Sequence, residues 1–159
     1  MKKARYRKLF LFAGPTLLID QVTKEIVVRT LPLHHSVEVI QGCFALTHIR
    51  NRGGAFGLLA EGGSGIRTVL FSAVSIMALG IILFIYSKVV SGKPWTTAAL
   101  ALIFGGALGN LIDRLRVGEV VDFLDFYIGT AHWPAFNVAD SAISIGAGIL
   151  FLCALVKKI

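Results

Sequence analysis

The sequence has few charged residues and no metal-binding motif. Only 16% of its 159 residues are charged and 55% are hydrophobic, whereas soluble domains carry about 25% charged residues. Its four histidines show neither HExxH nor HxxxH spacing, and neither of its two cysteines belongs to a CxxC pair. The composition therefore argues against an ordinary soluble domain, and we expect neither a metal nor any other cofactor.

Four apolar segments are long enough to cross a membrane. A helix needs about 20 apolar residues to span the hydrocarbon core of a bilayer. The segments that approach this length are Leu9–Val28, Thr68–Ser87, Trp95–Ile112 and Val138–Val156. No repeat, low-complexity tract or long linker divides the chain. Residues 1–159 are therefore predicted to form a single, all-α membrane domain with four transmembrane helices.

The basic residues are distributed unevenly around these segments. Residues 1–8, 88–94 and 157–159 hold nine of the 16 lysines and arginines and no acidic residue. With four spans these stretches lie on one side, and the positive-inside rule makes that side cytoplasmic. Both termini are therefore predicted to be cytoplasmic, and segments 29–67 and 113–137 to face outward. The net charge of +7 reflects this bias and does not indicate a nucleic-acid partner.

The first span begins like a signal peptide but has no cleavage site. A basic start leads into the apolar core Leu9–Ile19, and Asp20 and Lys24 then follow where small residues would be expected. We interpret this segment as a first helix that is retained.

The two predicted outer loops differ in composition. In the first, apolar and polar residues alternate over 37–39 and 44–46, on either side of Gln41-Gly42. This pattern predicts a short β-hairpin, which could form a platform on the outer bilayer surface. The second loop is aromatic, with Phe123, Phe126, Tyr127, Trp133 and Phe136. Such residues are typical of an interfacial belt, or they border a lipid-facing substrate groove.

Two aspartates at the outer boundary are the candidate catalytic residues. Asp122 follows the third span and Asp140 opens the fourth, so a single outer loop joins them. A carboxylate near hydrocarbon is costly and usually functional. Two neighbouring acids share a proton, because both do not ionise easily. The charged acid can then take a proton from water while the neutral one donates to an amide carbonyl.

Both aspartates also have a structural interpretation. Asn137 can serve as the N-cap of the last helix, with Asp140 at the third helical position, where an acid favours the helix dipole. Asp122 can be a solvated acid of the loop. The residues alone leave both alternatives open.

Further polar residues lie near the outer ends of the spans. Asp20 and Lys24 are four residues apart and share a helix face. They either cancel each other's charge or hold lipid or loop groups near the two acids. Asn110 and Arg114 have the same spacing. Arg114 can neutralise Asp113, bind a lipid phosphate, or fix the backbone around the candidate dyad.

A small proton- or ion-coupled transporter is the alternative function, because intramembrane acids and Lys24 could form a relay. Polar residues are scarce in the inner halves of the second and fourth spans, however, which argues against a continuous path. Three glycines of the third span, Gly105, Gly106 and Gly109, indicate close helix packing.

Five stretches of the chain, taken together, resemble lipoprotein signal peptidase, the bacterial type II signal peptidase family. They are Asp20–Lys24, Asn51–Gly57, Gly105–Arg114, Gly118–Phe123 and Phe136–Ser141. Each stretch alone is weakly specific. In this order and with four spans they are specific, and the resemblance covers nearly the whole chain.

The resemblance implies an aspartic endopeptidase with Asp122 and Asp140 as its catalytic pair. It also implies supporting or substrate-binding roles for Asp20, Lys24, Asn51, Gly54, Asn110, Arg114, Asn137 and Ala139. The implied substrate is a diacylglyceryl-modified prolipoprotein, cut just before its lipidated cysteine, in the bacterial cytoplasmic membrane with phospholipid as a further partner. Such a cysteine lies at the outer membrane–water boundary, which is the depth deduced for the two acids.

Overall fold

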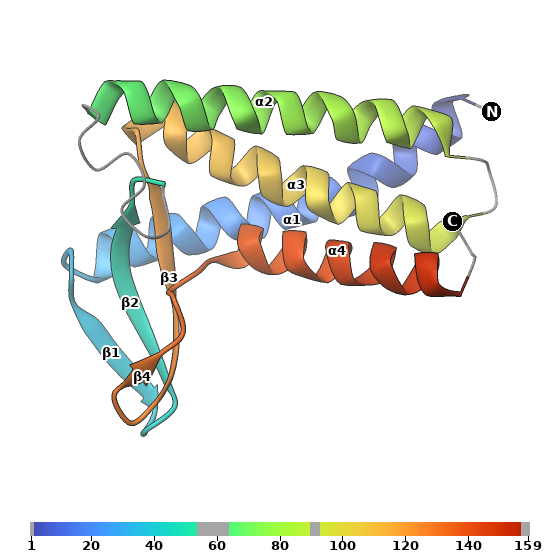
Figure 1. Ribbon diagram of the computed structural model, residues 1–159. Coiled ribbons are helices and arrows are strands. Elements are labelled where there is room, and N and C mark those ends of the chain that lie inside the picture. The colour runs from blue at the N-terminus through green and yellow to red at the C-terminus, as the bar shows by residue number, and fades with distance from the viewer. Residues whose placement is uncertain (1, 54–63, 90–92, 157–159) are drawn as a thin grey trace.

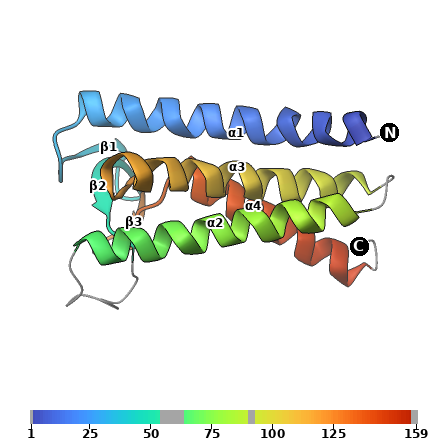
Figure 2. The same ribbon diagram turned by 90° about the horizontal axis from the view of Figure 1, so that it is seen from above.

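Four helices form a bundle that carries a small β-sheet across one end (Figure 1). The structure is a computed structural model and describes residues 2–53, 64–89 and 93–156. The helices are α1 (Lys2–Thr30), α2 (Ser64–Lys88), α3 (Pro94–Val117) and α4 (Val138–Leu155). Their axes lie along the length of the bundle, and consecutive helices run in opposite directions (Figure 2). The four predicted helices are thereby confirmed.

Three of the described helices, α2, α3 and α4, are long and apolar enough to cross a membrane by length and composition. Helix α1 has 29 residues, but Asp20, Lys24 and Glu25 interrupt its apolar run. These charges have partners in the structure, because Lys24 pairs with Asp20 and Glu25 pairs with Arg29. Pairing lowers the cost of keeping charged groups in such a helix.

Helix α3 extends beyond its predicted end at Ile112. It continues to Val117 and stops at Gly118, whose left-handed backbone (φ +80°) lets its N–H donate to the carbonyl oxygen of Arg114 at 3.0 Å. Glycine adopts this conformation without strain, which makes it a common helix terminator. Asp113 and Arg114 therefore lie on the helix itself, with orientations fixed by its last turns.

The sheet is built from both of the predicted outer loops. Its antiparallel strands are β1 (Ser36–Ile40), β2 (Phe44–Asn51), β3 (Val120–Ile128) and β4 (Ala131–His132), in that spatial order. Strands β1 and β2 are the predicted hairpin, with Val37 opposite Leu46. Strand β3 was not predicted, because the run from Val120 to Phe126 lacks a regular alternation of polar and apolar residues.

Glycines let α3 approach its neighbours closely. A Cβ at Gly105 would lie 2.8 Å from the carbonyl oxygen of Ala13 in α1. A Cβ at Gly106 would lie 2.4 Å from the carbonyl oxygen of Ala139 in α4. Real Cβ atoms do not come this close to a backbone oxygen, so the helices could not pack this way with larger residues. The predicted packing role of these glycines is confirmed.

Replacing Gly106 by alanine should destabilise the bundle by about 1–3 kcal/mol, because the new methyl group overlaps the backbone of α4. Gly148→Ala is the matched control, since a Cβ there would meet nothing within 4 Å, and alanine is the better helix former. Thermal unfolding of the purified proteins in one detergent measures the difference. Equal midpoints for Gly106→Ala and the unmodified chain would contradict the packing argument.

Candidate active site

The two candidate aspartates lie where β3 and α4 meet. Asp122, the third residue of β3, is 2% exposed, and Asp140, in the first turn of α4, is half-buried. Asn137 contacts both. Its Nδ2 donates to Oδ1 of Asp122 at 2.7 Å, and its backbone N–H donates to Oδ2 of Asp140 at 3.2 Å. A single residue therefore positions both carboxylates.

Asn137 is also the N-cap of α4. Its Oδ1 accepts from the backbone N–H of Asp140 at 2.9 Å, and the reciprocal bond to the Asp140 carboxylate completes a capping box. The predicted capping is confirmed, and it leaves the second oxygen of Asp140 available to another partner. That oxygen, Oδ1, accepts from Nδ2 of Asn110 at 2.8 Å. Capping thus fixes the orientation of the Asp140 carboxylate through one of its two oxygens only.

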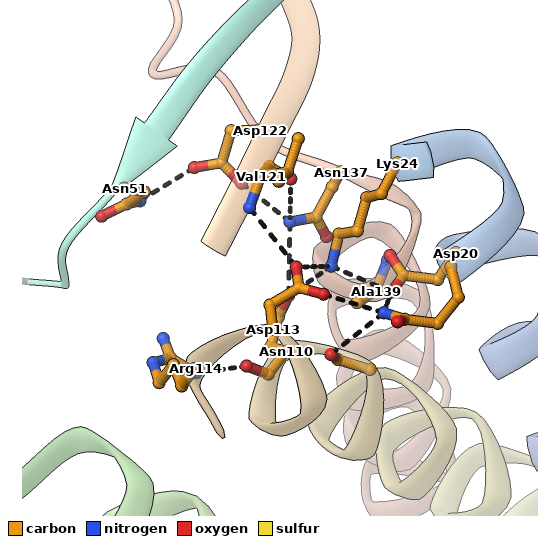
Figure 3. Close-up of polar contacts among 12 residues, drawn as sticks. Asp20, Lys24, Asn51, Asn110, Asp113, Arg114, Val121, Asp122, Asn137 and Ala139 are labelled. Atoms are coloured by element: carbon orange, nitrogen blue, oxygen red, sulfur yellow. Dashed lines mark hydrogen bonds and ion pairs between the residues drawn. The ribbon is translucent and has the colours of Figure 1, made fainter. Parts of the chain in front are cut away.

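Asp122 is buried, so the interpretation as a solvated loop acid is wrong. Its Oδ2 accepts from Nδ2 of Asn51 at 2.9 Å (Figure 3). Oδ1 of Asn51 in turn accepts from the backbone N–H of Gly53 at 2.9 Å. Burial raises the pKa of Asp122 most, and the negative charge of Asp140 raises it further. The amide donors of Asn51 and Asn137 lower it, and the resulting pKa is about 6.

Lys24 lies at the centre of a buried polar cluster next to Asp122 (Figure 3). Its ammonium group lies 2.9 Å from Oδ2 of Asp20 and 2.8 Å from Oδ2 of Asp113, and it donates to Oδ1 of Asn110 at 3.0 Å. A lysine has three N–H donors, so these contacts use all of them. The predicted pairing of Asp20 with Lys24 is confirmed, and Asp113 is a second acidic partner.

The contact with Lys24 determines how the Asn110 amide is oriented. An ammonium group only donates, so the amide oxygen must face Lys24 and the NH₂ group must face away. That NH₂ group donates to Asp140. The same Asn110 oxygen accepts from Nδ2 of Asn137 at 3.3 Å. The positive charge on α1 thereby ensures that Asp140 receives a hydrogen-bond donor.

Asp20 connects α1 to the start of α4. Its Oδ1 accepts from the backbone N–H of Ala139 at 2.9 Å, one residue before Asp140. The carboxylate fits against α3 because Gly109 has no side chain. A Cβ there would lie 2.5 Å from Oδ2 of Asp20. Gly109 therefore makes room for a polar group of the site as well as for a neighbouring helix.

Arg114 does not pair with Asp113, which corrects one predicted alternative. The two side chains are adjacent in the chain but leave α3 in different directions, and Lys24 takes the carboxylate of Asp113. Arg114 instead lies with its guanidinium 5.8 Å from the ring centre of Phe71, and its Nη1 lies 3.5 Å from Oγ of Ser75. It is half-buried near the dyad and does not contact either carboxylate.

Two residues of the cluster, Gln21 and Asp113, were not among the predicted site residues. Gln21 donates to Oδ1 of Asp113 at 2.9 Å and to Oδ2 of Asp20 at 3.1 Å. Oδ2 of Asp113 accepts from the backbone N–H of Val121 at 3.3 Å, next to Asp122. The spacing from Asn110 to Asp113 places both on one face of α3, and that signal could have identified the acid. Gly54 lies outside the described residues.

Within the described part of the chain, no group of three or more His, Cys, Asp or Glu side chains could hold a metal ion. The polar side chains of the site are amides, carboxylates and two cations, and they converge from three helices and two strands. Such a set can hold two acids at different protonation states, which is what acid–base hydrolysis requires.

Comparison with known proteins identifies the family. The protein-family model described as signal peptidase (SPase) II, Peptidase_A8, matches residues 12–156 of this chain. The lipoprotein signal peptidase of Geobacter sulfurreducens is 50% identical over 148 residues, 93% of this chain and 91% of that protein. The lipoprotein signal peptidase of Syntrophus aciditrophicus is 52% identical over 145 residues, 91% and 89% of the two chains.

Solved structures support the same assignment. A structure described as a bacterial membrane enzyme superimposes with a TM-score of 0.81 at 35% identity, covering 95% of this chain and 94% of the other. A second such structure also gives 0.81, at 36% identity, covering 94% and 88%. The chain therefore belongs to the signal peptidase II family and is a multi-pass membrane enzyme, an aspartic peptidase of the lipoprotein signal peptidase type.

Proposed function

We propose that this chain cleaves diacylglyceryl-modified prolipoproteins just before the lipidated cysteine, with Asp122 and Asp140 as the catalytic pair. The observation that carries the proposal is the bridging of both carboxylates by Asn137. The relatives named above are lipoprotein signal peptidases, which supports this class of substrate. The whole chain, residues 1–159, acts as one peptidase domain.

The environments of the two acids suggest different protonation states. Asp122 is the more buried, and its pKa is raised to about 6, so it holds the proton. Asp140 is more exposed and accepts hydrogen bonds from Nδ2 of Asn110 and the backbone N–H of Asn137. Two neighbouring acids share one proton, and we assign it to the more buried Asp122. Asp140 is therefore the general base and Asp122 the general acid.

This assignment gives a balanced hydrolysis. Asp140 takes a proton from water as the water oxygen attacks the carbonyl carbon of the scissile peptide bond, and Asp122 protonates the carbonyl oxygen. When the tetrahedral intermediate collapses, the C–N bond breaks, Asp140 returns its proton to the amine, and Asp122 regains its own. Asn51 and Asn137 support Asp122, while Asp20, Lys24, Asn110 and Ala139 position the start of α4.

The lipid on the substrate places the scissile bond at the right depth. The dyad lies at the end of the bundle that carries the sheet (Figure 1), where membrane-length helices end. A diacylglyceryl group adds about 0.8 kcal/mol of membrane affinity for each buried CH₂. The membrane thus supplies part of the orientation that peptide contacts would otherwise provide.

The charge distribution supports a topology for the enzyme in the bacterial cytoplasmic membrane. The sheet and the dyad face outward, and both termini lie in the cytoplasm, where the nine basic residues of the flanking segments gather. Membrane phospholipid surrounds the bundle. The transporter alternative is not retained, because the family is a family of peptidases.

Asp122→Asn and Asp140→Asn should each abolish cleavage and leave the protein folded. Asparagine keeps the shape of the side chain but cannot carry the proton. Asp125→Asn is the matched control, since this acid of the same strand pairs with His132 outside the cluster. The assay is cleavage of a lipidated precursor in proteoliposomes, with thermal unfolding as the check on folding. Substantial activity in either dyad variant would exclude the pair.

Activity should fall as the pH rises above about 6. The raised pKa of Asp122 means that the pair loses its single proton through this range, so kcat/KM should drop about tenfold per pH unit above it. Asn51→Ala removes a donor that lowers the pKa of Asp122, so the descending limb should move to higher pH. The measurement is a pH–rate profile of both proteins. A shift of the limb to lower pH would refute the assignment of the proton.

The same precursor without its diacylglyceryl group should be cleaved about tenfold more slowly or worse, because the lipid fixes the depth of the cysteine. Both forms are reconstituted in one bilayer composition, with Asp140→Asn as the background control. Equal initial rates would show that the lipid does not select the substrate.

Cys43 offers a direct test of the topology, because it is exposed in the turn between β1 and β2 and Cys153 is buried. A membrane-impermeant maleimide should label Cys43 in intact cells. The exposed Lys88 is the last residue of α2, at the end of the bundle away from the sheet. A cysteine placed there in a Cys43→Ser background should react only after the membrane is permeabilised. The reverse pattern would invert the orientation.

A further inference from the structure

A second polar pocket lies beside the active site, between α1, β2 and the last turns of α3. It has a volume of about 80 Å³, and its lining includes Lys24, Arg50, Arg116 and Val121. A single water needs only about 10–15 Å³ by this kind of measure. The pocket therefore has room for a group of several atoms.

The pocket and the dyad lie on opposite faces of the sheet. Successive side chains of a strand point to opposite faces. Val121 lines the pocket, so its neighbour Asp122 points away from it. Arg50 is paired with Val121 in the strand register, whereas Asn51 bonds to Asp122 on the other face. A ligand in this pocket would not touch either catalytic carboxylate.

Two arginines of the pocket make no ion pair or hydrogen bond with the part of the chain that the structure describes. The lining holds three cations, Lys24, Arg50 and Arg116, and two acids, Asp113 and Glu25. Lys24 pairs with Asp113 and with Asp20 behind the pocket, and Glu25 pairs with Arg29 at 2.7 Å. Arg50 is half-buried and Arg116 is exposed. Neither makes a hydrogen bond or ion pair within the described residues, although Arg116 lies near enough to Glu25 to act on its charge. The pocket thus presents a local excess of positive charge.

The type of basic residue points to the ligand. Outside the three predicted cytoplasmic stretches, the chain has one lysine and six arginines, which are Arg29, Arg50, Arg52, Arg67, Arg114 and Arg116. A guanidinium binds phosphate through two parallel N–H donors, whereas lysine acts as a point charge. A pair of uncompensated arginines in a pocket therefore suits a phosphate group.

The position in the bundle indicates where that phosphate comes from. Val28 and Val117 add apolar surface to the pocket, and each lies within two residues of the end of its helix, α1 or α3. Residues of both helix ends and Arg50 of β2 line this one pocket. Since α3 is long enough to span a membrane, its end lies at the level of lipid headgroups.

We propose that this pocket binds the phosphate diester of a membrane phospholipid. Arg50 and Arg116 hold the phosphate, and the acyl chains run down the apolar surface that begins at Val28 and Val117. Because Arg50 adjoins Asn51 in β2, the bound lipid also tethers the strand that supports Asp122. The binding of a phospholipid in this pocket does not depend on the catalytic roles proposed for Asp122 and Asp140.

Lipid binding to the purified full-length chain tests the proposal. Phosphatidylglycerol is titrated into delipidated protein in detergent, and bound lipid is counted by native mass spectrometry. Arg50→Gln with Arg116→Gln should weaken binding about tenfold or more, because two charge-assisted contacts are lost. Arg116→Gln alone, on an exposed side chain, should weaken it in part without threatening the fold. Diacylglycerol with the same chains, which lacks the phosphate, should not occupy the site.

Arg52→Gln is the matched control. It removes the same charge from an exposed arginine that pairs with Glu119 outside the pocket, and it should leave binding unchanged. Equal losses in this control and in the double variant would overturn the site in favour of general charge attraction. Unchanged binding in the double variant would also overturn it. Inorganic phosphate that binds as tightly as the lipid, with the same dependence on Arg50 and Arg116, would overturn the lipid as the source.

Discussion

The buried ammonium of Lys24 is the interaction on which the rest of the site depends. It joins α1 to α3 through Asp113 and Asn110, and it balances Asp20, which in turn holds the start of α4 through Ala139. Asp113 also accepts the backbone N–H of Val121, beside Asp122 in β3. One charge thus fixes the mutual positions of three helices and one strand. Of the two candidate carboxylates, Asp140 accepts directly from Asn110 of this cluster, and Asp122 is connected to it through Asn137.

Burying such a cluster is expensive, and the structure shows how the cost is limited. An ion moved out of water loses several kcal/mol of solvation, and only close partners with satisfied hydrogen bonds offset this loss. All three donors of Lys24 have partners, and Gln21 supplies further donors to the two acids. Gly109 lets α3 come close enough for these contacts. The glycines of α3 and the charges of α1 are therefore parts of a single arrangement.

The sequence was enough to predict the helices and to place Asp122 and Asp140 at the same end of the bundle, because apolar length and helix spacing are local properties. Asn137 as an N-cap and Asp20 with Lys24 follow directly from that spacing. Strand β3 and the role of Asp113 could not be predicted in this way. The strand is specified by pairing with β2, about 75 residues earlier in the chain. Asp113 stands next to Arg114 in sequence, and only the direction of its side chain on α3 reveals that Lys24 is its partner.

The division of the sheet between two distant loops affects how the enzyme comes into being. The β1–β2 hairpin is complete before α2 is made. The edge of β2 that faces away from β1 remains unpaired until β3 is made, after α3. Asn137, Ala139 and Asp140 arrive later still, at the start of the last helix. A chain still being synthesised therefore has neither a full sheet nor both candidate acids in place. If Asp122 and Asp140 act as proposed, the peptidase becomes competent only after the final helix has docked, so that insertion is itself the activating step.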